Sequence, residues 1–364
     1  MGFEIIRKNT KKIRIGDSFI GGNAPIAVQS MTNTDTRDVD ITVDQIKRLE
    51  DAGCDIVRVA VPDNEAALAI KQIKKMVKIP VVADVHFDYR LAISSMENGA
   101  DKIRLNPGNI GGEERIHQVV EVAKLRDIPI RIGVNSGSVE KDIAGKYGGI
   151  TPEGMVESAL RHIGILEKYQ FSNIVISIKA SNVPMTIAAY RLISQKSHYP
   201  IHIGVTEAGT IFRGTVKSAV ALGCLLAEGI GDTLRISLTG DPVEEIKVGR
   251  EILKALEIKK EGIEIISCPT CGRCLINLIP IVNTIENAIE VKLNCNKRLK
   301  NSNRNIRVAV MGCAVNGPGE AKEADIGIAG GKGEALLFKK GQVIRKIPQE
   351  QVVDELLKEI ENII

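Results

Sequence analysis

Residues 56–84 read IVRVAVPDNEAALAIKQIKKMVKIPVVAD, and this stretch decides the fold because it holds one complete strand–helix–strand unit. A run rich in Val and Ile, Ile56 to Ala60, precedes a segment with helical spacing of its apolar residues. A second such run, Val81 to Asp84, follows. Strands that helices cover on both faces are apolar along their whole length rather than alternating in polarity. The stretch therefore predicts two parallel strands joined by a helix.

The same unit recurs eight times in the first 256 residues. The eight predicted strands are Ile26 to Met31, Ile56 to Ala60, Val81 to Asp84, Lys102 to Leu105, Ile130 to Val134, Asn173 to Ser177, Ile201 to Val205 and Thr233 to Ser237. Eight such units in about 250 residues are the usual size of a TIM barrel. The main alternative, a doubly wound open sheet, lacks its early G-x-G-x-x-G turn here. We therefore predict an α/β fold with a (β/α)8 TIM barrel.

Helix signals separate these strands. Val43 to Gly53 places Ile46 and Leu49 on one face, and Gly53 suits the end of the helix. Before the eighth helix, Asp241 can accept hydrogen bonds from the first free N–H groups, and Pro242 suits the first helical position.

After Gly262 the character of the sequence changes, with clustered cysteines and then clustered glycines. A hairpin is predicted over Leu336 to Arg345, with Lys340-Gly341 as its turn, and a helix over Gln349 to Ile360. We expect two domains, a barrel over residues 1–258 and a small α+β domain over residues 263–364.

Composition excludes several classes of protein. The 364 residues are 44% hydrophobic and 26% charged, with a formal net charge of +4, and they contain no basic block interleaved with aromatic residues. We therefore expect no nucleic-acid partner. The first residues lack the apolar core of a signal peptide, and no run of 18 apolar residues suggests a membrane span. A cytoplasmic location follows as the expectation, in which the seven cysteines serve as ligands, core residues or catalysts rather than disulfides.

Cationic residues recur in or just after the predicted strands, where a plain core would have Val or Ile: Arg58, Arg104, Arg131, Lys179 and Arg235. A buried cation is costly unless it is paired, and the anions nearby are fewer, namely Asp84 and Glu207. Because active sites of TIM barrels lie at the carboxyl ends of the strands, the excess positive charge predicts a phosphorylated substrate. The alternative is a salt-bridged layer without a ligand, and Arg235, early on its strand, fits such a structural role best.

Other residues complete the predicted mouth of the barrel. The polar candidates are His86, Asn106, Asn135, Ser138, Ser177, Ser181 and Thr206. Glu207, just beyond the seventh strand, could act as a general acid if partial burial raises its pKa, or as an ion-pair partner for a nearby Arg.

The cysteine-rich segment reads SCPTCGRC over Ser267 to Cys274, and Cys313 follows in MGCAVNGPGE. Thiolates at this spacing bind zinc or an iron–sulfur cluster. A closed zinc site would take Cys268, Cys271, Cys274 and Cys313, whereas a catalytic cluster would leave one iron with a weak ligand such as Glu320. Cys54 and Cys224 are interpreted as small core residues, and Cys295 as a residue of a polar surface loop that does not bind metal.

Nine motifs together resemble the bacterial 4-hydroxy-3-methylbut-2-enyl diphosphate synthase family of the non-mevalonate isoprenoid pathway. They span nearly the whole chain in the order of the family: PIAVQSMTNTDTRD from Pro25, VRVAVPD, ADVHFD, IRLNPGN, RIGVNSGS, GVTEAG from Gly204, EGIGDT from Glu228, SCPTCGR from Ser267 and GCAVNGPGE from Gly312.

The resemblance implies an oxidoreductase that opens the ring of 2-C-methyl-D-erythritol 2,4-cyclodiphosphate with two electrons and loss of water. It implies a 4Fe–4S cluster on Cys268, Cys271, Cys313 and Glu320, and Glu207 as the proton donor. The positions that the family uses for the diphosphate and the ring fall on Arg58, Asp84, His86, Arg104, Asn106, Arg131, Asn135, Lys179 and Glu207. Ser138 and Thr206, polar residues of the mouth, complete the predicted substrate site. Ferredoxin or flavodoxin is the implied electron donor.

The chain departs from the family pattern at two places. Cys274 is an additional cysteine, and the stretch between Cys271 and Cys313 is long, with the surplus near Lys292 to Arg304. A different class of function stays open, in which the barrel acts on another phosphorylated substrate and the second domain is a structural zinc module that binds a partner. A sulfite or nitrite reductase with such a cluster would not explain the barrel.

The predicted topology also implies a head-to-tail homodimer, which agrees with the family. The eighth helix returns the chain to the bottom of the barrel, and a linker of about six residues spans roughly 20 Å at full stretch. The second domain of the same chain would have to climb back along a helix about 21 Å long before it reached the mouth. We therefore expect each cluster domain to cover the barrel of the other chain.

Overall fold

The structure is a computed structural model that describes the chain except residues 1–4, 107–108, 261, 296–304, 314–320 and 364, and it gives no side-chain environment for residues 290–295. The chain forms two compact units, Met1–Ile258 and Lys259–Ile364.

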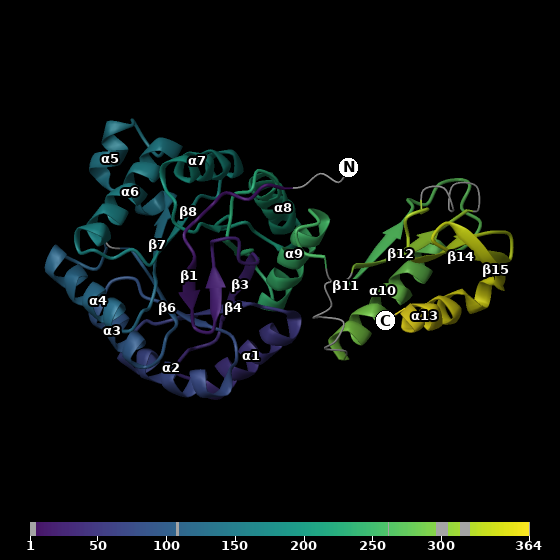
Figure 1. Cartoon of the computed structure of the whole chain (residues 1–364), viewed down its shortest axis with the longest axis horizontal. Coiled ribbons are helices and arrows are strands. Elements are labelled where there is room, and N and C mark those ends of the chain that lie inside the picture. The colour runs from purple at the N-terminus through teal and green to yellow at the C-terminus, as the bar shows by residue number, and fades with distance from the viewer. Residues whose placement is uncertain (1–4, 107–108, 261, 296–304, 314–320, 364) are drawn as a thin grey trace. The chain divides into compact units, whose positions relative to one another are not determined.

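The first unit is built around eight parallel strands (Figure 1). These are β3 (Ala27–Met31), β4 (Ile56–Ala60), β5 (Val81–Asp84), β6 (Lys102–Leu105), β7 (Ile130–Asn135), β8 (Ile174–Lys179), β9 (His202–Ile203) and β10 (Thr233–Leu234). Their order in space is β8-β7-β6-β5-β4-β3-β10-β9, and a single bridge between Ile176 and Ile201 joins the two ends. The sheet is thus a nearly closed barrel, and the predicted TIM-barrel fold is confirmed.

Helices surround the strands in Figure 1 and bury the outer faces of the strands. They are α1 (Val39–Ala52), α2 (Asn64–Met76), α3 (Tyr89–Glu97), α4 (Glu113–Leu125), α5 (Lys141–Lys146), α6 (Pro152–Lys168), α7 (Val183–Lys196), α8 (Ile211–Ala227) and α9 (Pro242–Ala255).

The ends of these helices follow the local signals in the sequence. Asp241 accepts a hydrogen bond from the Val243 N–H and caps α9 as predicted. Gly53 ends α1 with φ at 92°, a conformation that a residue with a Cβ rarely adopts. The predicted start of α1 at Val43 is one turn late, because Asp38 caps the helix from further upstream.

A short antiparallel hairpin, β1 (Ile13–Ile15) and β2 (Ser18–Ile20), lies across one end of the barrel (Figure 1). Its Ile13, Ile15 and Ile20 form an apolar cluster with Ile56, Val82 and Val175 at the amino ends of the strands. The hairpin therefore closes the end opposite to the mouth. Our strand predictions began only at Ile26 and missed it, because two three-residue strands give too short a pattern.

The second unit has a five-stranded sheet of order β11-β12-β13-β14-β15. The strands are β11 (Gly262–Ser267), β12 (Asn305–Met311), β13 (Ile326–Gly330), β14 (Glu334–Lys339) and β15 (Gln342–Pro348). The first three are parallel and the last three are antiparallel. The helices α10 (Leu278–Cys295) and α13 (Val352–Ile363) share one apolar core with the sheet.

Two predictions for this unit have different outcomes. The β14–β15 hairpin is confirmed, and its turn residues Lys340 and Gly341 both have positive φ, at 49° and 75°. The predicted surface loop over Lys292 to Arg304 is partly wrong, because α10 extends to Cys295. Ile285 and Ile289 hold the preceding turns of the helix against the core.

In the part of the chain that the structure describes, no helix is both long enough and apolar enough to cross a bilayer.

The hairpin should contribute measurably to the stability of the barrel. Ile15→Ala removes a fully buried side chain from the floor cluster, and we expect it to lower the free energy of unfolding by about 2–5 kcal/mol. Arg14→Ala, on the exposed face of the same strand, is the matched control and should change it by under about 0.5 kcal/mol. Urea denaturation followed by circular dichroism measures both, and equal midpoints would contradict a structural role for the hairpin.

Candidate functional site

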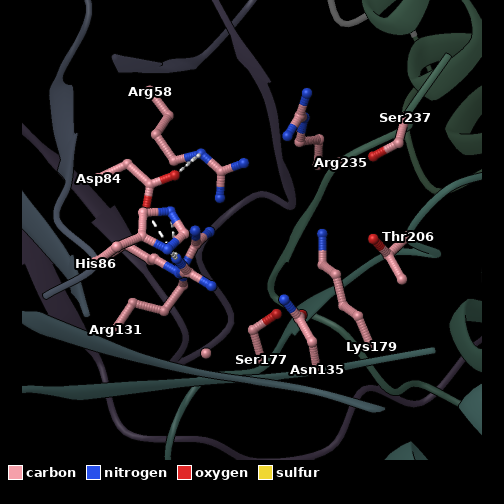
Figure 2. Close-up of a pocket in the computed structure, with 12 residues that line it drawn as sticks. Arg58, Asp84, His86, Arg131, Asn135, Ser177, Lys179, Thr206, Arg235 and Ser237 are labelled. Atoms are coloured by element: carbon pink, nitrogen blue, oxygen red, sulfur yellow. Dashed lines mark hydrogen bonds and ion pairs between the residues drawn. The ribbon is translucent and has the colours of Figure 1, made fainter. Parts of the chain in front are cut away.

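A cavity opens at the carboxyl ends of the barrel strands (Figure 2). Seven of the eight strands, or the residues just beyond their ends, supply its lining. The lining residues are Arg58, Asp84, His86, Arg104, Arg131, Gly133, Asn135, Ser177, Lys179, Thr206, Arg235 and Ser237. Because the strands are parallel, their polar ends meet at one mouth, as the sequence pattern predicted.

Asp84 is the charge partner at one side of this cavity. Its carboxylate lies 3.0 Å from Arg104 NH1 and 3.5 Å from Arg58 Nε, and the His86 Nε2 atom lies 3.6 Å away. Figure 2 shows this group on one side of the cavity and Lys179 with Thr206 on the other. Burial alone would raise the pKa of Asp84, but the charge of Arg58, a hydrogen bond to His86 and the charge of Arg104 hold it well below its ordinary value.

Two further cations of the cavity form no ion pair with a carboxylate of the described residues. Arg131 is 1% exposed, and its Nε and NH1 atoms have no hydrogen-bond partner among the described residues. Burial, followed by repulsion from Arg58 and Arg104, lowers the pKa of Arg131 well below its ordinary value. Burial and repulsion from Arg235 lower the pKa of Lys179 in the same way. A negatively charged ligand close to Arg131 and Lys179 would therefore stabilise their charged forms.

Two glycines make room for the cations. A Cβ atom on Gly133 would lie 2.8 Å from Arg104 Nε, and one on Gly204 would lie 2.7 Å from Lys179 Nζ. Such distances are shorter than real contacts, so any side chain at these strand positions would displace a cation. Glycine inside a strand is the sequence signal for close approach, and our sequence analysis did not use it.

Arg235 has both of the roles that the sequence left open. It lines the cavity, and its Nε atom lies 3.3 Å from Glu245 in α9. Glu245 also accepts hydrogen bonds from Ser30 Oγ at 2.7 Å and from the Leu238 N–H. The second buried carboxylate of the mouth is therefore Glu245, which the sequence did not single out because it lies in a helix.

The cavity brings together most of the predicted substrate residues. Those that line it are Arg58, Asp84, His86, Arg104, Arg131, Asn135, Lys179 and Thr206. Asn106 is buried just beyond β6, and Ser138 exchanges hydrogen bonds with the backbone of Asn135; neither is among the lining residues. Ser138 therefore acts on the cavity through the loop that carries Asn135.

Glu207 directly follows the lining residue Thr206 but is exposed, with φ at 52°. Partial burial, the condition under which we expected a raised pKa, is absent in the barrel unit.

In the second unit, the cysteines lie at the carboxyl ends of two paired parallel strands. Cys268 follows β11 and Cys313 lies two residues beyond β12. The Gly312 N–H donates to Cys268 Sγ at 3.2 Å, and the Leu275 N–H donates to the Gly312 carbonyl at 3.0 Å. The turn after Cys268 therefore folds back onto the residue that precedes Cys313.

Cys271 and Cys274 differ in their surroundings. Cys271 is exposed, and hydrogen bonds from the backbone and then the side chain of Arg273 lower its pKa, which favours the thiolate that binds metals. Cys274 packs against the apolar core, and its Sγ atom donates to the Ile276 carbonyl at 3.2 Å. These thiols fit an iron–sulfur cluster in kind, although no three metal-ligating side chains of the described residues already surround one point. Glu320, the predicted fourth ligand, lies outside the described residues.

The remaining cysteines, Cys54, Cys224 and Cys295, were not predicted to bind metal. Cys54 is a buried core residue as predicted, and burial raises its pKa to about 12. The prediction for Cys224 is wrong, because this thiol lies half-buried in α8 and contacts Arg191 and Glu228. Of Cys295 the structure describes the helical backbone alone.

Fold and site together define a (β/α)8-barrel protein with a strongly cationic mouth, joined to a thiol-rich α+β domain. Residues 10–250 match the GcpE TIM-barrel domain, and residues 264–362 match the GcpE protein C-terminal domain. The chain therefore belongs to the GcpE family.

Similar proteins carry one name. A protein of Ruminiclostridium cellulolyticum is 69% identical over 356 residues, covering 98% of both chains. One of Caldanaerobacter subterraneus is 62% identical and covers 99% of this chain and 98% of its own. Both are named 4-hydroxy-3-methylbut-2-en-1-yl diphosphate synthase (flavodoxin). Among solved structures, type I 3-dehydroquinate dehydratase from Clostridium difficile aligns with a TM-score of 0.51 at 14% identity, covering 68% of this chain and 98% of its own, which shows the barrel fold alone.

Asp84 should be essential to the stability of the mouth. Asp84→Asn removes the shared partner of Arg58 and Arg104, and we expect it to lower the free energy of unfolding by about 3–5 kcal/mol at pH 7. Since folding lowers the pKa of Asp84 from 3.8, its contribution is present above pH 3.8 and is lost as the pH falls below this value. Urea denaturation at pH 7 and at lower pH, with exposed Asp44→Asn as the control, measures the difference. A difference that does not shrink in acid would contradict the ion-pair explanation.

Proposed function

We propose that this chain is a 4-hydroxy-3-methylbut-2-en-1-yl diphosphate synthase, as its relatives are named. It opens the ring of 2-C-methyl-D-erythritol 2,4-cyclodiphosphate, taking up two electrons and releasing one water. The observation that carries the proposal is the joint presence of an over-cationic barrel mouth and a thiol-rich second unit in one chain of the GcpE family.

The mouth has the charge that a cyclic diphosphate needs. Five cations, Arg58, Arg104, Arg131, Lys179 and Arg235, lie with two buried carboxylates among the described residues. A cyclic diphosphate brings two negative charges and oxygens that match guanidinium geometry. We assign the phosphates to the unpartnered Arg131 and Lys179, with Asn135, Ser177 and Thr206 as neutral hydrogen-bonding groups.

We infer that Cys268, Cys271 and Cys313 hold a 4Fe–4S cluster, with Glu320 as the fourth ligand. Such a cluster would supply the electrons one at a time. Two observations support the thiol assignment: Cys271 favours the thiolate, and the Gly312 N–H already donates to Cys268 Sγ. A closed zinc site would need Cys274, whose thiol is directed to the Ile276 carbonyl. Flavodoxin, printed in the names of the relatives, is the favoured electron donor, and ferredoxin is the alternative.

Glu207 is proposed as the proton donor. Its position beside Thr206 places it at the rim of the mouth, and its exposure leaves it accessible to a group brought over that mouth.

We further propose that the working site combines the barrel of one chain with the cluster domain of another. Helix α9 runs back toward the floor of the barrel, where Arg250 donates to the Gly53 carbonyl ahead of β4. The six residues between α9 and β11 span roughly 20 Å at full stretch, which is about the length of the helix along which the chain would have to return. An exposed apolar stripe on α8, formed by Phe212, Val216 and Val220, supports pairing of two chains.

The first test is turnover. The protein with a reconstituted cluster and a flavodoxin reducing system should convert the cyclodiphosphate to 4-hydroxy-3-methylbut-2-enyl diphosphate, as followed by mass spectrometry. Glu207→Gln should bind the substrate with unchanged affinity but lose at least about 100-fold in kcat, because it removes a proton donor and no phosphate contact. Arg131→Ala should instead weaken binding. Parent-like turnover in Glu207→Gln would exclude the general-acid role.

The second test concerns the metal ligands. We expect Cys274→Ser to keep the iron content and visible absorbance of the parent, and Cys313→Ser to lose both. Of these two cysteines, only Cys313 is assigned to the cluster. Elemental analysis and absorption spectroscopy measure this without turnover. Loss of iron in Cys274→Ser would indicate four cysteine ligands and refute Glu320, and a colourless protein with bound zinc would refute the cluster.

The third test is complementation. Glu207→Ala chains and Cys313→Ser chains, each inactive alone, are mixed under conditions that exchange subunits. The mixed dimer has one site with an intact barrel and an intact cluster, so up to about a quarter of parental activity should return if exchange is random. Native mass spectrometry shows whether mixed dimers form. Their formation without activity would mean that each chain uses its own cluster.

A further inference from the structure

A second polar layer lies inside the barrel, one step below the residues that line the cavity. Side chains of a strand alternate between its two faces, so Lys102 shares the inward face of β6 with the lining residue Arg104. His202 shares the inward face with the lining residue Thr206. Gln29 stands two positions below Met31, whose sulfur accepts from Arg58 Nε at 3.1 Å. We call Gln29, Lys102 and His202 the lower layer.

The lower layer is buried and its polar atoms are not satisfied. All three residues are 0% exposed. Lys102 Nζ, His202 Nε2 and both amide atoms of Gln29 have no hydrogen-bond partner among the described residues. Only His202 Nδ1 is engaged, with Thr233 Oγ1 at 2.8 Å. The apolar floor cluster of the β1–β2 hairpin lies beneath, so the cavity above is the polar side of this layer.

Positive charges surround Lys102. Arg131 on the neighbouring β7 and Arg58 on β4 both repel a positive charge on Lys102. On β5, Asp84 is already engaged by Arg58 and Arg104. Beyond β7, β8 carries Lys179 and β9 carries His202, whose pKa burial and these cations lower well below its ordinary value.

The carboxylate that attracts Lys102 most directly, Asp101, already accepts hydrogen bonds from other groups. Asp101 precedes Lys102, but its Oδ2 atom accepts from Lys74 Nζ and from the Val81 N–H, each at 2.6 Å. Burial, followed by repulsion from Arg131 and Arg58, lowers the pKa of Lys102 well below its ordinary value. Lys102 therefore gives up its proton more readily than an exposed lysine does.

We propose that Lys102 takes up a proton from solvent when a dianion occupies the cavity, so that it acts as a charge-compensating residue that couples substrate binding to proton uptake. The negative charge of the ligand offsets the field of Arg131 and Arg58, which otherwise opposes a charge on Lys102. An N–H bond forms on Lys102, and the bond that held this proton in a hydronium ion or a buffer acid breaks. The inference takes only the identity of the natural dianion from the proposed function.

Coupling of this kind gives a definite pH dependence. Because the proton binds together with the ligand, the dissociation constant should rise with pH by up to about tenfold per pH unit over the range in which Lys102 is protonated only in the complex. Proton uptake should be larger with doubly charged ligands, because a singly charged ligand offsets less of the positive potential of Arg131 and Arg58 at Lys102.

The experiment measures protons taken up on binding. Calorimetric titrations at pH 8 to 9, in buffers of different ionisation enthalpy, use two probes, inorganic sulfate and the cyclodiphosphate. Both probes are fully ionised dianions in this range and release no proton themselves. We expect Lys102→Met to lower proton uptake by about one proton per barrel relative to the parent, with a flatter pH dependence of affinity. Lys124→Met, an exposed lysine of α4, is the matched control and should equal the parent.

Further variants keep the test decisive. If Lys102→Met does not fold, Lys102→Arg replaces it, since arginine holds its proton with or without ligand and should lose the same uptake. Equal uptake in parent and variant, or no uptake in the parent with either probe, would overturn the proposal. Uptake lost in His202→Gln but kept in Lys102→Met would assign the proton to His202 and also overturn it. Uptake dependent on Lys102 with sulfate, without binding of the cyclodiphosphate, would refute the proposed function and leave this inference standing.

Discussion

Positive charge buried inside the barrel is the constraint on which the rest of the structure depends. Arg58 and Arg104 lie in the interior because Asp84 reaches both, at 3.5 and 3.0 Å. Arg235 is held by Glu245 from the outer helix layer. Arg131, Lys179 and Lys102 form no ion pair with a carboxylate among the described residues, and burial lowers the pKa of each. Removing charge from water is costly, so these buried cations oppose folding unless negative charge lies close to them.

Several features exist to accommodate that charge. Gly133 and Gly204 leave space for Arg104 and Lys179, where any Cβ would collide. The β1–β2 hairpin seals the other end with isoleucines, so that polar groups reach solvent only through the mouth. A bound anion then serves as the missing counter-ion, and its binding should stabilise the native state by mass action.

In the second unit, too, parallel strands bring functional side chains together at their carboxyl ends, but these side chains are thiols rather than cations. Parallel strands β11 and β12 end side by side and place Cys268 next to Gly312, just as the barrel strands bring cations to one mouth. A Cβ on Gly312 would lie 2.5 Å from Cys274 Sγ, so the residue before Cys313 must be glycine for the turn to fold back. Reactive groups are common in loops at strand ends. The sheet fixes where such a loop begins, while the length of the loop can vary.

The sequence alone determined the barrel, because eight β-rich runs with helical segments between them have few other compact solutions. It also determined most of the mouth, since residues at the ends of parallel strands must converge, as Arg58, Asp84, Arg104, Arg131 and Lys179 do. The tertiary structure decided which charges are paired. Glu245 lies on a helix and Glu207 at a strand end, yet only Glu245 is buried against an arginine. It also decided that Lys102 lies below the cavity without a partner, because pairing depends on distances across the barrel between strands far apart in sequence.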